Sequence, residues 1–136
     1  MSAGDFNTQV IHEFRANGGS VGGPFEGAPL LLLHHRGAQS GTERVTPLVY
    51  LADGERYLIF ASKGGAPENP AWFHNLKAHP DTKIEVGAQT LAVTAQELTG
   101  EERDRLYDRQ AAAMPNFREY QDKTSRKIPV VALTPS

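Results

Sequence analysis

The Asp53-Gly54 pair is the sequence feature that most constrains the fold of this chain. It lies between the apolar segments Leu51-Ala52 and 56–60 (RYLIF). An Asp-Gly pair flanked by strand-forming residues is the strongest short-range signal of a two-residue β-hairpin turn. The sequence therefore predicts two antiparallel neighbouring strands here. A second hairpin is predicted around residues 87–89, where GAQ separates two alternating segments.

Other segments predict further strands. Residues 30–35 begin with four leucines and suit a strand that is buried on both faces. A strand that begins near Arg44 has apolar residues on both of its faces, as in a closed barrel. Pro47 within it has no amide hydrogen, which places it at a sheet edge, at a bulge or next to a ligand. With a last strand at 128–133, about six short strands predict an α+β, mainly β fold: an antiparallel barrel with helices packed outside.

Helices are predicted from caps and apolar spacing. A first helix is expected over about 6–16, capped by Asp5 and followed by a glycine-rich loop at 18–27, for which a plain connector is favoured over a lid. A second helix is expected to have Asn69 as its N-cap and Pro70 at its first position. A capping box at 99–102 opens a third helix to about residue 113, and a short helical segment then carries Phe117 and Tyr120.

Size and composition predict one domain and exclude several classes of function. The chain has 136 residues, a formal net charge of −2 and no cysteine. Its basic residues are scattered singly, so nucleic acid is not expected as a partner, and disulfides and thiol chemistry are excluded. The N-terminus lacks the features of a signal peptide, and the longest apolar run, Ala28–Leu33, is too short to span a bilayer. We therefore expect a soluble, cytoplasmic protein.

Two glycine-containing turns are the candidates for a ligand site. Residues 37–41 precede Arg44, and residues 62–65 have the sequence SKGG. Glycine, hydroxyl and cationic residues together are typical of a backbone cradle for an anionic ligand. Arg44 by itself would be interpreted as a solvated cation, and the adjacent Ser40-Gly41 turn favours anion binding. No metal site is predicted, because the consecutive His34 and His35 of a strand face opposite sides.

Several segments together resemble one known family. They are Ser40-Gly41 followed by Arg44, residues 46–48 (TPL), residues 61–65 (ASKGG) and residues 69–76 (NPAWFHNL). The chain resembles, over nearly its whole length, the deazaflavin-dependent nitroreductase family, small split β-barrel proteins that bind 8-hydroxy-5-deazaflavin, coenzyme F-420. The resemblance implies that residues 1–136 form a single deazaflavin-binding split β-barrel domain, in which 1–28 supply the N-terminal helix and glycine-rich loop.

The resemblance also implies roles for individual residues. The loop would hold the phosphate and oligoglutamate tail through Gln39, Ser40, Gly41 and Arg44, while Thr46, Pro47, Ser62, Lys63 and Gly64 would line the deazaflavin ring, Trp72 and Asn75 would complete the pocket, and Phe117 and Tyr120 would contact the substrate. The chain departs from its relatives at Ala38-Gln39, where a basic pair is common. This leaves Arg44 and Lys63 with more of the anion binding.

The implied activity is transfer of a hydride from the reduced cofactor to an organic acceptor such as a quinone, a nitroaromatic or an enone. Lys63 would stabilise negative charge on the ring, and Tyr120 would donate a proton to the reduced acceptor. Two alternatives stay open: an FMN-dependent oxidoreductase of the same fold, and a non-catalytic protein that carries the cofactor or a hydrophobic ligand. A homodimer is compatible with each of these alternatives.

Overall fold

The computed structural model describes residues 3–22 and 27–135. In chain order its elements are α1 (Ala3–Ala16), β1 (Leu30–Arg36), β2 (Glu43–Val49), β3 (Leu51–Asp53), β4 (Arg56–Phe60), the 3-10 turn η2 (Lys63–Gly65), α2 (Ala71–Ala78), β5 (Asp81–Val86), β6 (Gln89–Leu98), α3 (Gly100–Ala113), α4 (Asn116–Asp122) and β7 (Val130–Pro135).

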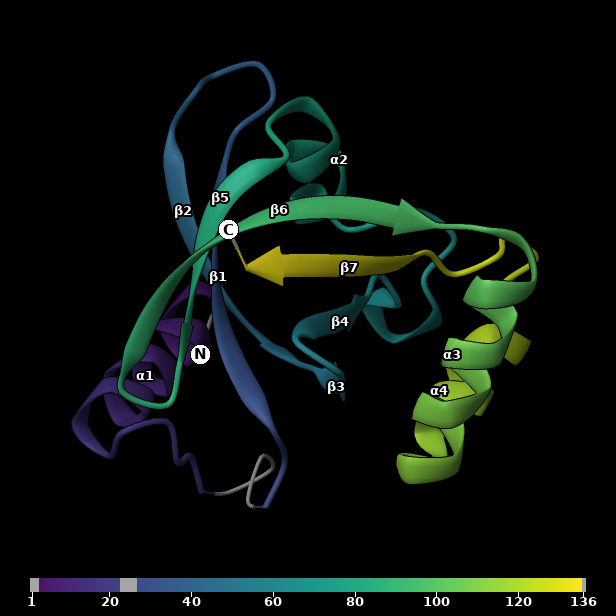
Figure 1. The fold of residues 1–136 in the computed structure, drawn as a ribbon, viewed down its shortest axis with the longest axis horizontal. Helices are drawn as coiled ribbons and strands as arrows, with labels where there is room; N and C mark the ends of the chain where they lie inside the picture. Colours follow the sequence, from purple (N-terminus) through teal and green to yellow (C-terminus); the bar gives the residue numbers. More distant parts are fainter. Residues whose placement is uncertain (1–2, 23–26, 136) are drawn as a thin grey trace.

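The seven strands form one curled antiparallel sheet in the order β2-β1-β5-β6-β7-β4-β3. Its two edge strands, β2 and β3, are separated only by Tyr50, so the sheet curls back on itself as a half-barrel (Figure 1). The Tyr50 amide donates to the Pro29 carbonyl at 3.0 Å. The predicted α+β antiparallel barrel is confirmed, and the single strand expected from about residue 44 to 52 is divided at Tyr50. Pro47 lies in an edge strand, as expected from its missing donor.

Three apolar clusters make up the core. One lies inside the curl of the sheet, where Leu33 of β1 and Ile59 of β4 meet α2. A second joins α3 and α4 to the other face of β4 and β7, and a third joins α1 to the outer face of β1. Strands β1, β4 and β7 are therefore buried on both faces, which explains their near-continuous apolar sequences. The helices α1, α3 and α4 pack outside as predicted, whereas α2 contributes side chains to the interior cluster.

Both predicted hairpins are present, with one change. Asp53 is paired with Arg56, which makes Gly54 and Glu55 the two turn residues. Gly54 has φ +60°, and glycine at the first turn position is typical of a type II′ hairpin. The turn is therefore one residue later than predicted, which puts Gly54 at the turn position that has a positive φ, and the Asp53 carboxylate accepts a hydrogen bond from Arg56 Nε at 2.9 Å. The second turn falls at Gly87-Ala88, between the paired residues Val86 and Gln89.

Two helix starts differ from the prediction. Helix α1 begins at Ala3, two residues before the expected cap at Asp5. Helix α2 has Pro70 rather than Asn69 at its cap position, because the Asn69 side-chain oxygen instead accepts a hydrogen bond from Arg126 at 2.7 Å. Thr99 is the cap residue of α3, as predicted, but its side chain makes no capping hydrogen bond.

Residues 23–26 of the predicted glycine-rich loop lie outside the described residues. No helix in the described part of the chain is both long and apolar enough to cross a membrane.

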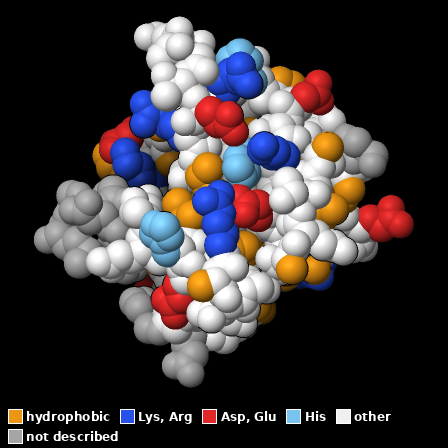
Figure 2. Space-filling model, turned by 90° about the vertical axis from the view of Figure 1, so that its left-hand side faces the viewer, with side chains coloured by type: hydrophobic (Ala, Val, Ile, Leu, Met, Phe, Trp, Pro, Cys, Tyr) orange, Lys and Arg blue, Asp and Glu red, His pale blue; other side chains and the backbone are white. Residues whose placement is uncertain are grey.

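On the face at the left of Figure 1, basic, acidic and histidine side chains are interspersed (Figure 2). The cytoplasmic location stays a prediction.

Candidate functional site

A groove of about 530 Å³ separates the β1–β2 loop from α2. Figure 1 shows the two elements side by side at the top of the molecule. The groove is lined by Gly37, Ala38, Gln39, Ser40, Arg44, Ala71, His74 and Asn75. Four predicted site residues, Gln39, Ser40, Arg44 and Asn75, are therefore brought together, although the first three are far from Asn75 in the sequence.

The β1–β2 loop is closed by its own hydrogen bonds. The Gly37 amide donates to Thr42 O and the Gly41 amide donates to Gly37 O, each at 2.9 Å. A side chain at Gly37 would collide with the Ser40 hydroxyl, and Gly41 has φ +71°, a conformation that favours glycine. Hydrogen bonds within the loop therefore produce the tight turn, and Gly41 contributes by adopting the backbone conformation that the turn requires.

Arg44 is the cation that faces this groove. Its side chain is exposed and makes no hydrogen bond or ion pair with any residue in the described ranges 3–22 and 27–135. Its guanidinium donors are thus available to an anionic group in the groove, in the planar arrangement that suits phosphate and carboxylate.

The second predicted turn, 62–65, is held from behind by Arg126. This guanidinium donates to the carbonyls of Ala61 at 3.1 Å, Ser62 at 2.9 Å and Ala66 at 2.9 Å. It also reaches the side chain of Asn69. Burial lowers the pKa of Arg126 from its ordinary value, but the residue keeps its charge because arginine titrates far above neutral pH. Sequence reasoning missed Arg126, which is about 60 residues from its partners.

The hydrogen bonds of Arg126, called the clamp below, determine the direction in which the amides of the 62–65 turn point. In a trans peptide the carbonyl and the next amide point in opposite directions. Because the carbonyls of Ala61 and Ser62 face Arg126, the amides of Ser62 and Lys63 face away from it. Ser62 is right-handed helical, while Lys63 and Gly64 have φ +47° and +63°. Such a right-to-left sequence forms a concave nest for an anion, and among the described residues no backbone acceptor meets the amides of residues 62–64.

Lys63 itself has a partner. Its ammonium lies 2.8 Å from Glu68, and both side chains are exposed. The predicted role of Lys63 at the ring stays a prediction, and its side chain has to leave Glu68 to contact a ligand. The turn also contacts α4, because a side chain at Gly65 would lie 2.9 Å from the Tyr120 carbonyl.

Trp72 and Pro47 do not line the groove between the β1–β2 loop and α2, and their roles at the deazaflavin ring stay predictions. Trp72 is 5% exposed and belongs to the cluster inside the sheet, so its indole is a core contact and does not line the groove. Pro47 is paired with Leu32, on the opposite face of β2 from Thr46, which is paired with Leu33. Adjacent strand residues alternate between faces, so Thr46 and Pro47 cannot present their side chains to one ring.

The two predicted substrate residues differ in burial. Phe117 is 7% exposed and packs edge-on against Phe60, with ring centroids 5.7 Å apart, so it is a core residue. Tyr120 is partly exposed, and its hydroxyl accepts a hydrogen bond from Asn116 at 2.8 Å. Of the pair, only Tyr120 has a polar group that a substrate can reach.

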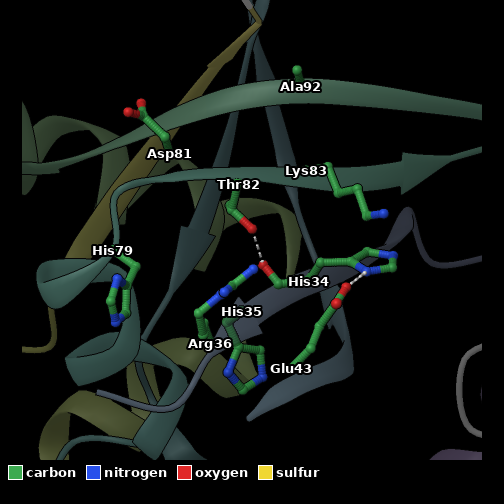
Figure 3. Close-up of a pocket in the computed structure, with 9 residues that line it drawn as sticks. All are labelled: His34, His35, Arg36, Glu43, His79, Asp81, Thr82, Lys83 and Ala92. Carbon is green, nitrogen blue, oxygen red and sulfur yellow. Dashed lines mark hydrogen bonds and ion pairs between the residues drawn. The ribbon is translucent and has the colours of Figure 1, made fainter. Parts of the chain in front are cut away.

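His34 and His35 lie on opposite faces of β1, as expected. Both residues contribute to the lining of a second cavity of about 370 Å³, in which the His34 ring points toward Glu43 and the His35 ring lies apart from it (Figure 3). His34 Nε2 is 2.7 Å from Glu85, and Arg15 of α1 donates to the same carboxylate at 2.7 Å. The Arg15 hydrogen bond is the largest cause that lowers the pKa of Glu85 to about 2. This cluster therefore attaches α1 to the sheet.

His35 is the other site residue that sequence reasoning missed. Its ring is 5% exposed and contacts Thr46 and Asn75 through its two nitrogens, at 2.8 Å and 2.9 Å. Burial, followed by the charge of Arg44, lowers the pKa of His35 to about 4. It is therefore neutral at physiological pH.

Comparison with known proteins supports the resemblance. A family model described as F420H(2)-dependent quinone reductase matches residues 7–135. An F420H(2)-dependent quinone reductase of Mycobacterium tuberculosis is 46% identical over 125 residues, which cover 89% of this chain and 84% of that protein. The solved structure of an F420-H2 dependent reductase (FDR-A) is 40% identical with a TM-score of 0.71, covering 77% of this chain and 93% of that one.

A second solved structure, described as a domain-swapped dimer, is 35% identical with a TM-score of 0.73 and covers 97% of this chain and 99% of that one. The family model spans nearly the whole chain, and the mycobacterial relative is similar over most of both proteins. These matches confirm the predicted resemblance, and the chain belongs to the F420H(2)-dependent quinone reductase family.

Proposed function

We propose that this chain is an oxidoreductase that binds reduced deazaflavin, coenzyme F-420, between the β1–β2 loop, α2 and the 62–65 turn, and reduces a quinone. The observation that carries the proposal is the 46% identity to an F420H(2)-dependent quinone reductase over 89% of the chain. The arrangement of anion-binding groups supports it, because the cofactor has both a phosphate and carboxylates.

The residues present fit an anionic ligand with a planar ring. Arg44 and the Gln39–Gly41 turn would hold the phosphate and carboxylate end, since Arg44 has no partner in the described part of the chain. The amides of Ser62 and Lys63, which point away from Arg126, would hold the polar end of the ring. These amides are fixed dipoles and require no rearrangement to stabilise negative charge there. They can therefore supply the role first assigned to the Lys63 ammonium.

When bound, the reduced deazaflavin supplies a hydride to the organic acceptor. The chain orients the reactants and provides a proton. The Tyr120 hydroxyl accepts from Asn116, so its own hydrogen is free to be donated. The packing of α4 on the 62–65 turn supports Tyr120 as the residue that would protonate the acceptor oxygen once it is reduced. Phe117 holds Tyr120 through an edge-on contact, with ring centroids 5.3 Å apart.

Binding titrations with coenzyme F-420, FMN and FAD test the cofactor. We expect saturable binding of coenzyme F-420 and much weaker binding of the other two. Tight FMN binding without deazaflavin binding would instead support the FMN-dependent oxidoreductase of the same fold. Steady-state oxidation of the reduced cofactor by quinones, nitroaromatics and enones then separates an enzyme from a carrier.

The proton donor is tested by Tyr120→Phe. General acid catalysis contributes roughly 10²- to 10⁴-fold, so kcat with a quinone should fall by at least about tenfold while cofactor affinity is retained. An unchanged kcat would exclude Tyr120 as the donor. Asn116→Ala, which removes the group that orients the hydroxyl, should produce a smaller loss.

We also propose that the chain forms a homodimer. A relative of similar length was solved as a domain-swapped dimer, and its structure covers 97% of this chain. Sedimentation equilibrium over a range of concentrations tests this, and a monomer at all concentrations would contradict it.

A further inference from the structure

The buried ring of His35 connects the two walls of the cofactor groove. On one side its Nε2 atom is 2.8 Å from the Thr46 hydroxyl of β2. On the other side its Nδ1 atom is 2.9 Å from Asn75 Nδ2 of α2. Asn75 in turn accepts a hydrogen bond from the Ala38 amide at 3.0 Å. One side chain thus links β2, α2 and the β1–β2 loop.

The direction of each hydrogen bond follows from the Ala38 amide. A backbone N–H can only donate, so Asn75 uses its side-chain oxygen to accept from Ala38 and turns its NH₂ group toward His35. His35 Nδ1 must then be the acceptor. A neutral imidazole carries a single N–H, which is therefore on Nε2 and is donated to Thr46. Burial, the largest cause of the lowered pKa of His35, keeps the ring neutral.

The consequence falls on Thr46. Its oxygen accepts from His35, so its own hydrogen is free, and in the described part of the chain no other group accepts it. Thr46 is partly exposed and lies on the same face of β2 as Arg44, the face that meets α2. The Thr46 hydroxyl can therefore donate a hydrogen bond to a ligand that lies beside this face.

We propose that His35 is a positioning residue that holds the Thr46 hydroxyl as a hydrogen-bond donor to an acceptor atom of the bound deazaflavin. This inference rests on the proposed function. The same ring holds Asn75 and the Ala38 amide, so it also fixes the opposite wall of the groove. A histidine that only filled core space would contribute to folding but would not set the polarity of Thr46.

The ring nitrogens give a direct test in the ligand-free protein. Nitrogen-15 NMR of His35 should show an unprotonated Nδ1 and a protonated Nε2 at neutral pH. A protonated Nδ1, or a doubly protonated ring, would overturn the assignment. This measurement does not depend on cofactor binding, so it stands even if the proposed function fails.

A double-mutant cycle tests the coupling, with the dissociation constant of oxidised coenzyme F-420 as the readout and an unfolding midpoint measured for each variant. Thr46→Val and His35→Asn should each weaken binding by about tenfold, which corresponds to one hydrogen bond. The double variant should also be about tenfold weaker, because Thr46→Val removes the hydroxyl and His35→Asn removes the group that orients it, so both changes disrupt the same hydrogen bond to the ligand. A loss of about a hundredfold in the double variant would show independent effects and contradict the proposal.

Two controls keep the result interpretable. Thr46→Ser keeps the hydroxyl and should bind within about threefold of the wild type, whereas a loss equal to that of Thr46→Val would contradict the role of the hydroxyl. His12→Asn changes an exposed histidine of α1 and should leave the affinity unchanged. If the wild type does not bind coenzyme F-420, the proposed function fails, and if it binds and Thr46→Val binds equally well, only this inference fails.

Discussion

The 62–65 turn depends on Arg126, and replacing this residue should affect both stability and ligand binding. Arg126 makes four hydrogen bonds, three to carbonyls and one to Asn69. A typical hydrogen bond contributes about 0.5–1.5 kcal/mol net. Water can replace part of the set because the turn is partly exposed. We therefore expect Arg126→Ala to lower the free energy of unfolding by about 2–4 kcal/mol.

The assay is thermal unfolding followed by circular dichroism. In a domain of this size each kcal/mol shifts the Tm by roughly 3–4 °C, so Arg126→Ala should lower the Tm by about 6–16 °C. Arg126→Lys should recover less than half of the loss, because one ammonium cannot reach acceptors spread around a planar guanidinium. Arg118→Ala is the matched control. The Arg118 side chain is exposed and makes no hydrogen bond or ion pair within residues 3–22 and 27–135, so its removal should leave the Tm nearly unchanged.

Cofactor affinity separates the clamp from a general stabilising role. Without Arg126 the amides of Ser62 and Lys63 lose their fixed direction, so at a temperature where the variant is fully folded we expect the affinity for coenzyme F-420 to fall by about tenfold or more. An Arg126→Lys protein with the Tm and the cofactor affinity of the wild type would refute the reasoning, because lysine cannot reproduce the geometry.

Three further outcomes are expected. Arg44→Ala should weaken coenzyme F-420 binding by about 10- to 100-fold with a shallower salt dependence and an unchanged Tm. If titrations give the variant the affinity and salt dependence of the wild type, the tail of the cofactor does not bind at the β1–β2 loop. The pKa of His35 is lowered from 6.5 to about 4, so its contribution to the free energy of unfolding is complete above pH 6.5 and is lost as the pH falls toward 4. The loss should be on the order of 3 kcal/mol, and urea titrations across pH should show it in the wild type but not in His35→Gln. Gly65→Ala should lower the free energy of unfolding by about 2–4 kcal/mol and Gly64→Ala by only about 1 kcal/mol, because both glycines have positive φ but only a side chain at Gly65 would lie 2.9 Å from Lys123. Equal unfolding midpoints would contradict this.

Local chemistry was enough to predict much of the architecture. Gly54 and Gly87 mark the two hairpins because their positive φ favours glycine, and the prediction missed only which residue pair closes the first turn. The four leucines of β1 and the alternating β5–β6 segments indicated the strand positions for a similar reason, since burial on both faces leaves a continuous apolar run and burial on one face leaves alternation. The two glycine turns and Arg44 could be identified as ligand candidates on the same basis.

The tertiary structure decided which of these residues face one another. Trp72 lies in the core and Pro47 on the far face of β2, although both belong to motifs of the family. Arg126 and His35 gained their partners only when the sheet curled, because the atoms they bind come from other elements, some of them 40 to 65 residues away. Backbone preferences act between neighbours in the sequence, whereas a hydrogen bond depends on where the folded path of the chain places both groups. The amino-acid sequence by itself therefore determined the turns and strands, and the folded chain determined the direction of the amides and hydroxyls that a ligand would meet.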